Sequence, residues 1–355
     1  MTTATPDARV DERDTMFARM ARKEGTPAYE EYYTRRPELK ETDDRLRRMP
    51  ELCRPGGLRY DSEISGQAEA YFEAIEGIEP DETTVECWAD VLRTSTDPSP
   101  VLRAMARELG AVEAGTTAVD PAYVYSHKGR HDEDYGRPLE PEHGWALIFL
   151  VEMDHGAMRQ APDAPVLRES ARQYYRAAAI SMTMAAALER AGYPARSQHD
   201  AHYDVILPPL AVDAGLGEVG RNNILVADRY GSRVRIGAVT TELPLKQAEP
   251  IDLGVERFCA LCRKCAENCP SRSLRTDGKE EVRGIRKWTT RAETCYAYWR
   301  RTGTDCGICM AGCPFSHPDN AFHNAVRRSL ARMPWLAGFA LWWDNLLYGR
   351  DWKRV

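Results

Sequence analysis

Eight cysteines in the last third of the sequence have a spacing that suits iron–sulfur chemistry. The chain has 355 residues and ten cysteines. The first run is Cys259-x2-Cys262-x2-Cys265-x3-Cys269-Pro270, and the second is Cys295-x10-Cys306-x2-Cys309-x3-Cys313-Pro314. Two-residue spacing lets one turn of backbone reach three corners of a [4Fe–4S] cubane. The x3 step and the proline then carry the fourth cysteine to the other cluster.

This crossing rule predicts the ligands of two clusters. One set is Cys259, Cys262, Cys265 and Cys313, and the other is Cys269, Cys295, Cys306 and Cys309. Cys295 fits least well, because its spacing is irregular. Structural zinc is the alternative, since CxxC units also bind zinc, but two runs that both end in Cys-Pro favour clusters. Cys53 and Cys87 stand apart and are predicted to be inert buried thiols.

Charge and composition argue against several classes of protein. The net charge is −6, and residues 1–90 carry 22 acidic and 13 basic side chains, so nucleic acid is not favoured as a partner. No run approaches the roughly 18 apolar residues that cross a bilayer, and the polar N-terminus lacks a signal sequence. These features predict a cytoplasmic protein with no membrane partner. Residues 270–301 are locally basic, with nine basic and four acidic side chains.

The elements that must position the cysteines fall into four regions. Residues 1–120 are predicted to be mainly helical, and residues 121–254 to form an α/β core. In that core we predict strands at 145–151, 205–207 and 234–240, and a long helix at 165–190 that Gly192 ends. Residues 255–318 are the ferredoxin-like segment. In the tail, 319–355, the predicted packing residues are Trp335, Trp342, Trp343 and Trp352.

Two clusters in one segment form an electron path, and a path needs a terminus. Beyond the cysteine runs, the sequence resembles cobalamin-dependent reductive dehalogenases of the soluble, catabolic type. The segments that carry this resemblance are 214–221, 233–245, Tyr32-Tyr33-x3-Pro37, 192–195 and Tyr348-Gly349-Arg350-x-Trp352. The resemblance covers nearly the whole chain. It implies a corrinoid, bound base-off in an α/β core similar to that of vitamin B12-processing proteins, beside one cluster.

The resemblance also implies how the corrinoid is held and what it does. It implies that the backbone approaches the corrinoid closely at the turn that contains Gly215, Gly217 and Gly220. The structural alternative is a tight turn with close packing. The implied reaction is R–X + 2e⁻ + H⁺ → R–H + X⁻, with the proton supplied by a tyrosine near a cation.

Matched to this sequence, the family pattern places the proton donor at Tyr174, with Tyr175 in reserve, and the cation at Arg235. A neighbouring cation favours phenolate, so we expect it to lower the pKa of the tyrosine. For Tyr174, a purely structural role as a core aromatic is the alternative. Other candidate substrate residues are His199, His202 and Arg300.

Three further functions stay open at this point. An epoxyqueuosine reductase-like enzyme shares the corrinoid domain and both cysteine runs but acts on a modified tRNA base. A pure electron carrier needs only about 60 of these residues, and a corrinoid-handling protein would release its corrinoid. For a dehalogenase, we expect a separate low-potential donor of the ferredoxin or flavodoxin type. The basic stretch 270–301 is its expected docking face, which a charge reversal of Arg283, Arg286 and Lys287 would test.

Overall fold

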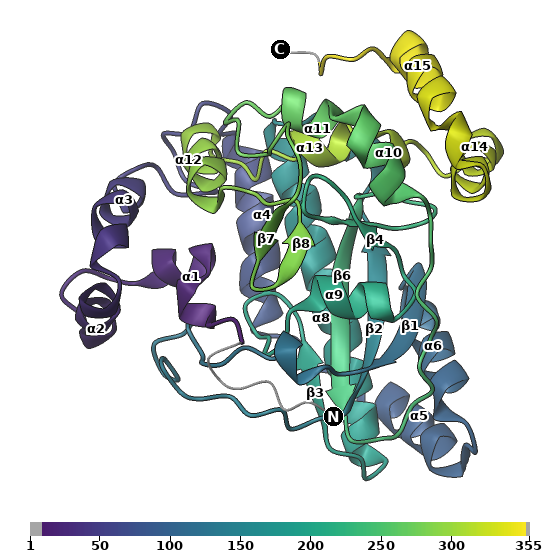
Figure 1. Ribbon diagram of the computed structural model, residues 1–355. Coiled ribbons are helices and arrows are strands. Elements are labelled where there is room, and N and C mark those ends of the chain that lie inside the picture. The colour runs from purple at the N-terminus through teal and green to yellow at the C-terminus, as the bar shows by residue number, and fades with distance from the viewer. Residues whose placement is uncertain (1–8, 353–355) are drawn as a thin grey trace.

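The computed structural model describes residues 9–352, and a four-stranded antiparallel sheet lies at its centre (Figure 1). The order of the strands is β1(Glu113–Ala118), β2(Trp145–Glu152), β6(Val234–Thr241) and β3(Ala195–Gln198). Each neighbouring pair is antiparallel, with Ile148 of β2 opposite Ala238 of β6. Residues 146–151 are fully buried, which explains their unbroken apolar sequence, because both faces of this strand are covered.

Helices cover both faces of the sheet. One face packs on α8(Ala164–Arg190) together with α5(Glu82–Thr94) and α6(Pro98–Glu108), and α4(Ser62–Ile75) packs along α8. The other face packs on α9(Leu207–Asp213) and the loop after β1. Pro165 stands in the first turn of α8, and Gly192, with φ of 96°, follows its end. The predicted long helix and its stop are therefore confirmed.

The N-terminal helices lie against the cysteine segment rather than against the sheet (Figure 1). They are η2(Glu12–Asp14), α1(Met16–Ala21), α2(Pro27–Arg35) and α3(Pro37–Arg47). Arg19 donates to both oxygens of the buried Asp43, at 3.0 and 2.6 Å, and to Glu293 of α12 at 2.6 Å. A buried ion pair with these three charge-assisted hydrogen bonds fixes α1 to both α3 and α12.

The cysteine segment occupies one end of the sheet (Figure 1). It comprises α10(Val255–Cys262), α11(Lys264–Glu267), β7(Glu280–Val282), β8(Ile285–Lys287), α12(Ala292–Thr302), α13(Ile308–Ala311) and η4(Pro314–Ser316). The chain then forms α14(Ala321–Arg332), η5(Pro334–Leu336) and α15(Ala337–Tyr348). The remaining short elements are η3(Pro121–Tyr123), α7(His155–Met158), β4(Glu218–Val219) and β5(Leu225–Val226).

Three sequence-based expectations about these elements need correction. Residues 205–207 form no strand: Val205 makes a single bridge to Val124, and α9 begins at Leu207, where two prolines suit the first turn of a helix. The region up to 120 is not helical throughout, since β1 lies within it and belongs to the central sheet.

The third correction concerns the tail. Trp352 does pack on the core, donating its indole N–H to the Ala161 carbonyl at 2.9 Å. Trp335, Trp342 and Trp343 instead remain 77, 56 and 41% exposed. Helix α15 is apolar on both sides, and only its inner side, which includes Ala337, meets the body of the protein.

Among the described residues, no helix has both the length and the apolar character needed to cross a membrane.

Candidate redox site

The fold brings the eight clustered cysteines together as two groups of four. Cys259, Cys262, Cys265 and Cys313 line one small cavity, and this set is named the outer group. Cys269, Cys295, Cys306 and Cys309 line part of a larger cavity, and this set is named the inner group. These are the two ligand sets that the crossing rule predicts. The groups are adjacent, because Cys309 interacts electrostatically with both Cys265 and Cys313.

Local backbone geometry turns the sulfur atoms inward. Helix α10 ends at Arg263, whose φ of 58° reverses the chain between Cys262 and Cys265. Cys306 and Gly307 also have positive φ, 64° and 71°. A Cβ at Gly307 would lie 2.7 Å from Val166, so this close approach to α8 requires glycine.

The cysteine surroundings suit cubanes. Burial raises the pKa of Cys259 and Cys306 to about 12, so these thiols become thiolates only when a cation binds them. The Ser273 backbone N–H donates to Cys269 Sγ at 3.3 Å, and such bonds tune cluster potentials. Within residues 9–352, no three His, Cys, Asp or Glu side chains converge on the position of a single ion. A cubane, whose irons occupy separate corners, needs a wider spacing than one zinc ion.

The inner group opens into a large cavity. Two adjoining hollows make up this cavity, with volumes of about 430 and 510 Å³. They share one stretch of wall, formed by Phe17, Tyr174, Arg235, Tyr296, Trp299 and Asp305. The wall therefore combines α1, α8, β6 and α12 with the loop that precedes Cys306.

Tyr174 and Arg235 meet in this wall, as the resemblance implies. Ser170 and Tyr174 are four residues apart on α8 and so share one face of the helix. The Arg235 guanidinium lies 4.8 Å from the centre of the Tyr174 ring and donates to Ser170 Oγ at 2.7 Å. It also pairs with Asp305 at 3.3 Å, and Ser170 donates to the same carboxylate.

The protonation state of Tyr174 differs from expectation. Burial raises the pKa of Tyr174, the carboxylates of Asp200 and Asp305 add to the effect, and Arg235 only partly opposes it. The predicted lowering of the pKa is therefore wrong, because desolvation of the phenolate outweighs the cation. Burial likewise raises the pKa of Asp305. Tyr174 consequently keeps its proton at neutral pH.

Three buried polar atoms in the cavity wall lack a protein partner. They are Arg235 Nε, Asp305 Oδ1 and Thr290 Oγ1. Buried donors and acceptors are rarely left unpaired, so each calls for a partner that the protein does not supply. The rim of a corrin ring carries carboxamides, which both donate and accept hydrogen bonds. The three unpaired atoms fit a ligand with such a rim.

The glycine turn has a structural explanation. A Cβ at Gly215 would lie 2.6 Å from the Glu249 carbonyl oxygen, and one at Gly217 would lie 2.4 Å from that of Val226. A Cβ at Gly220 would be 2.9 Å from Asn222 Oδ1. The three glycines are not among the described residues that line the cavity, whereas residues 222–224, just after the turn, are. Contact between these glycines and a corrinoid stays a prediction.

The weaker candidates are distributed around the cavity. Arg300 lines it, but its guanidinium donates to the carbonyls of Pro50 at 2.6 Å and Arg47 at 3.2 Å, and is therefore buried rather than on a basic surface. His202 pairs with Glu76 at 2.9 Å and, like His199, lies behind the lining. Tyr175 packs on Tyr71, with ring centres 6.0 Å apart.

Sequence reasoning missed several residues of the cavity wall. The Phe17 ring packs against the rings of Tyr296 and Trp299, with centre-to-centre distances of 6.0 and 6.1 Å. Arg130 lies 5.1 Å above the Phe17 ring and pairs with Asp200 at 3.4 Å. No short motif marks these side chains. Asp305 had one usable signal, its position directly before Cys306.

Replacing Arg235 by leucine is expected to lower the free energy of unfolding by about 3–5 kcal/mol, because Asp305 then becomes a buried carboxylate without its cation. The pair is well shielded, with side-chain exposures of 14 and 9%. Anaerobic denaturant titration of cluster-loaded protein measures the loss. Asp305→Asn in the Arg235→Leu background should recover much of it. Equal losses in the single and double variants would show that the two side chains are not coupled.

Fold and cysteine pattern together define an iron–sulfur protein with two clusters beside an α/β core, and comparison with known proteins agrees. Residues 258–317 match the 4Fe-4S dicluster domain. The tetrachloroethene reductive dehalogenase of Desulfitobacterium hafniense is 31% identical over 193 residues, which are 51% of this chain and 34% of that protein. That of Sulfurospirillum multivorans is 31% identical over 213 residues, 58% of this chain and 40% of that protein.

Two further comparisons extend this result. The epoxyqueuosine reductase of Lactococcus garvieae is 32% identical over 120 residues, 32% of this chain and 33% of that protein. Among solved structures, the catabolic reductive dehalogenase NpRdhA superposes with a TM-score of 0.74 and 26% identity, over 96% of this chain and 46% of that one. The chain is thus a homologue of reductive dehalogenases and shares their fold. It spans well under half the length of the curated dehalogenases it matches.

Proposed function

We propose that this protein is a corrinoid-dependent reductive dehalogenase. The observation that carries the proposal is one hollow lined by both the inner cysteine group and Tyr174, with Arg235 over the tyrosine ring. Such a cavity has an electron source on one side and a proton source on the other. Both are required for R–X + 2e⁻ + H⁺ → R–H + X⁻.

In this proposal a corrinoid fills the hollow next to the inner group. When bound and reduced, it supplies the electrons that cleave the carbon–halogen bond. Asp305 Oδ1, Arg235 Nε and Thr290 Oγ1 would hold its carboxamides, since all three are buried and unpaired. The corrinoid is proposed to be base-off, and no histidine lines either hollow among residues 9–352. The two groups of cysteines would conduct electrons from outer to inner.

Tyr174 would supply the proton. Its raised pKa keeps the phenol protonated in the resting enzyme, and Arg235 stabilises the phenolate left after transfer. Ser170 and Asp305 hold Arg235 in place. The aromatic rings of Phe17, Tyr296 and Trp299 keep water away from the reacting carbon. Electrons would come from a separate donor of low potential.

The epoxyqueuosine reductase relative makes a tRNA base the second candidate substrate. The hollow on that side is lined by Glu51, Glu76, Asp200 and Asp305 together with Arg130, Arg235 and Arg300, so its charge does not decide between the two substrates. Assays on both substrates separate the two functions.

Cofactor loading followed by substrate assays tests the proposal. Protein folded anaerobically with iron, sulfide and hydroxocobalamin should hold about eight irons, as two [4Fe–4S] clusters require, and one cobalt per chain. With titanium(III) citrate as reductant, the loaded protein should release halide from a panel of aryl and alkyl halides, and cobalt-free protein should not. Eight irons without cobalt, or turnover of epoxyqueuosine tRNA alone, would refute the proposal.

A further inference from the structure

Helices α14 and α15 present an apolar face that nothing within residues 9–352 covers. Nine of the 14 large hydrophobic side chains that stand exposed in the described chain lie between Phe322 and Tyr348. Phe339 is 61% exposed, Leu346 64% and Leu347 51%. Soluble proteins seldom leave a contiguous apolar patch of this kind in water unless it binds something.

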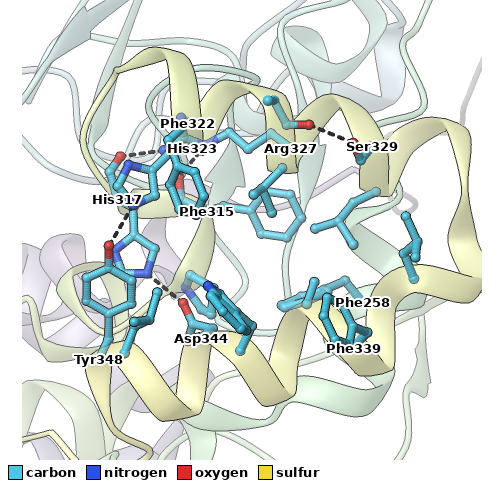
Figure 2. Close-up of a pocket in the computed structure, with 18 residues that line it drawn as sticks. Phe258, Phe315, His317, Phe322, His323, Arg327, Ser329, Phe339, Asp344 and Tyr348 are labelled. Atoms are coloured by element: carbon cyan, nitrogen blue, oxygen red, sulfur yellow. Dashed lines mark hydrogen bonds and ion pairs between the residues drawn. The ribbon is translucent and has the colours of Figure 1, made fainter.

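Between the two helices runs a groove whose floor is shared with the outer cysteine group. Phe258 precedes Cys259, and Phe315 follows Cys313 by two residues. Both rings line the small cavity of the outer group and also the groove between α14 and α15. Their centres are 5.3 Å apart. Figure 2 shows Phe258 and Phe315 between the two helices, with Phe339 facing them from α15.

A buried polar network fastens α15 over the outer group. Asp344 accepts from His317 at 2.6 Å (Figure 2). It also pairs with Lys264, which stands between Cys262 and Cys265. Lys264 donates in addition to the Gly349 carbonyl at 2.7 Å. Burial opposes ionisation of Asp344, but His317 and Lys264 outweigh it and hold its pKa below the usual range. The groove is therefore a fixed part of the outer-group site.

The exposed charges on this face are mainly basic. Among residues 321–352, Arg328, Arg332 and Arg350 are exposed against one exposed acid, Asp351, and Arg350 pairs with Glu267. Arg328 and Arg332 are exposed on α14, and neither forms an ion pair within the described chain. Arg263, exposed above the outer group, also forms none there. An apolar surface rimmed by arginines complements an acidic protein with an apolar centre.

We infer that the α14–α15 face is the docking site of the electron donor, an acidic protein that carries a low-potential one-electron group. The inference rests on the proposed function, which places the terminal cofactor at the inner group and so makes the outer group the entry point. A donor seated in the groove contacts Phe258 and Phe315, the wall of the outer group. This location replaces the basic stretch 270–301 expected from the sequence.

Matched charge reversals at the two surfaces test the inference. One variant is Arg328→Glu/Arg332→Glu on α14. The control is Arg286→Glu/Lys287→Glu on the β7–β8 hairpin, where both residues are exposed and the change in charge is identical. Stopped-flow absorbance follows cluster bleaching by photoreduced flavodoxin. The α14 variant should be reduced about tenfold more slowly at low salt, and the hairpin variant within about twofold of the parent protein. A third variant, Phe339→Ser/Leu347→Ser, should also slow the reaction.

Reduction by titanium(III) citrate must stay unchanged in every variant, which separates docking from cluster assembly. These readouts need no dehalogenation, so failure of the proposed function leaves them interpretable. Slower reduction of the hairpin variant alone would overturn the inference. Donor rates that stay unchanged in the α14 and α15 variants would also overturn it. Loss of self-association in sedimentation, or of binding to phosphatidylglycerol vesicles, in those variants would then assign the face to a second copy of the chain or to a membrane.

Discussion

Tyr174→Phe is expected to retain both clusters and the corrinoid yet lose about 10²–10⁴-fold in the rate of halide release, the usual contribution of a positioned general acid. The substitution removes one hydroxyl from the cavity wall and leaves Arg235 in its pairs with Ser170 and Asp305. Steady-state halide release under saturating titanium(III) citrate measures the effect, with iron and cobalt contents determined on the same sample.

Tyr175→Phe is the matched control, because the neighbouring ring packs on Tyr71 outside the cavity. It should release halide at the parental rate. If both variants kept that rate, the proton would have to come from elsewhere in the wall. The raised pKa of Tyr174 adds a second check, since activity should persist to alkaline pH and fall only as the phenol ionises.

Cys295→Ala is expected to remove the inner cluster and all dehalogenation while the outer cluster remains. Iron should fall from about eight to about four per chain, because each cubane holds four irons. Cys295 lies with Cys269, Cys306 and Cys309, even though its sequence spacing is irregular. Iron analysis and electron paramagnetic resonance of the reduced protein measure the loss.

Cys87→Ala serves as the control, since this cysteine lies on α5, far along the chain from both groups. The prediction that Cys53 and Cys87 are buried is wrong, because Cys87 is exposed and Cys53 only partly buried. The control variant should keep about eight irons, the content of two cubanes. About eight irons retained by Cys295→Ala, with two electrons still accepted per chain, would instead assign the fourth ligand to another residue.

Much of the site was predictable because the residues that define it lie in short segments of the sequence. The two cysteine groups follow from spacing alone, and α8 follows from helical periodicity between Pro165 and Gly192. The roles of Tyr174 and Arg235 were predicted only from the family resemblance, because helical periodicity fits a tyrosine of the core equally well. Whether Tyr174 acts as the proton donor awaits experiment.

The rest depended on contacts between distant parts of the chain. The pKa of Tyr174 is set by burial under α1 and α12, which no local pattern reveals. The tail tryptophans lie in an apolar sequence typical of a core, yet Trp335, Trp342 and Trp343 are exposed. Helix α15 has more apolar surface than the rest of the described protein covers. Asp305 acquires its role only when β6 brings Arg235 to within 3.3 Å.

The contacts of the N-terminal helices set an order on assembly. Arg19 donates a hydrogen bond to Glu293, and the Arg300 guanidinium donates to the carbonyls of Arg47 and Pro50. The first fifty residues therefore leave the ribosome long before the groups that hold them exist. Phe17, one wall of the cavity, can reach its place only after the inner cysteines have been made. Until Phe17 docks against Tyr296 and Trp299, the cavity lacks that part of its wall.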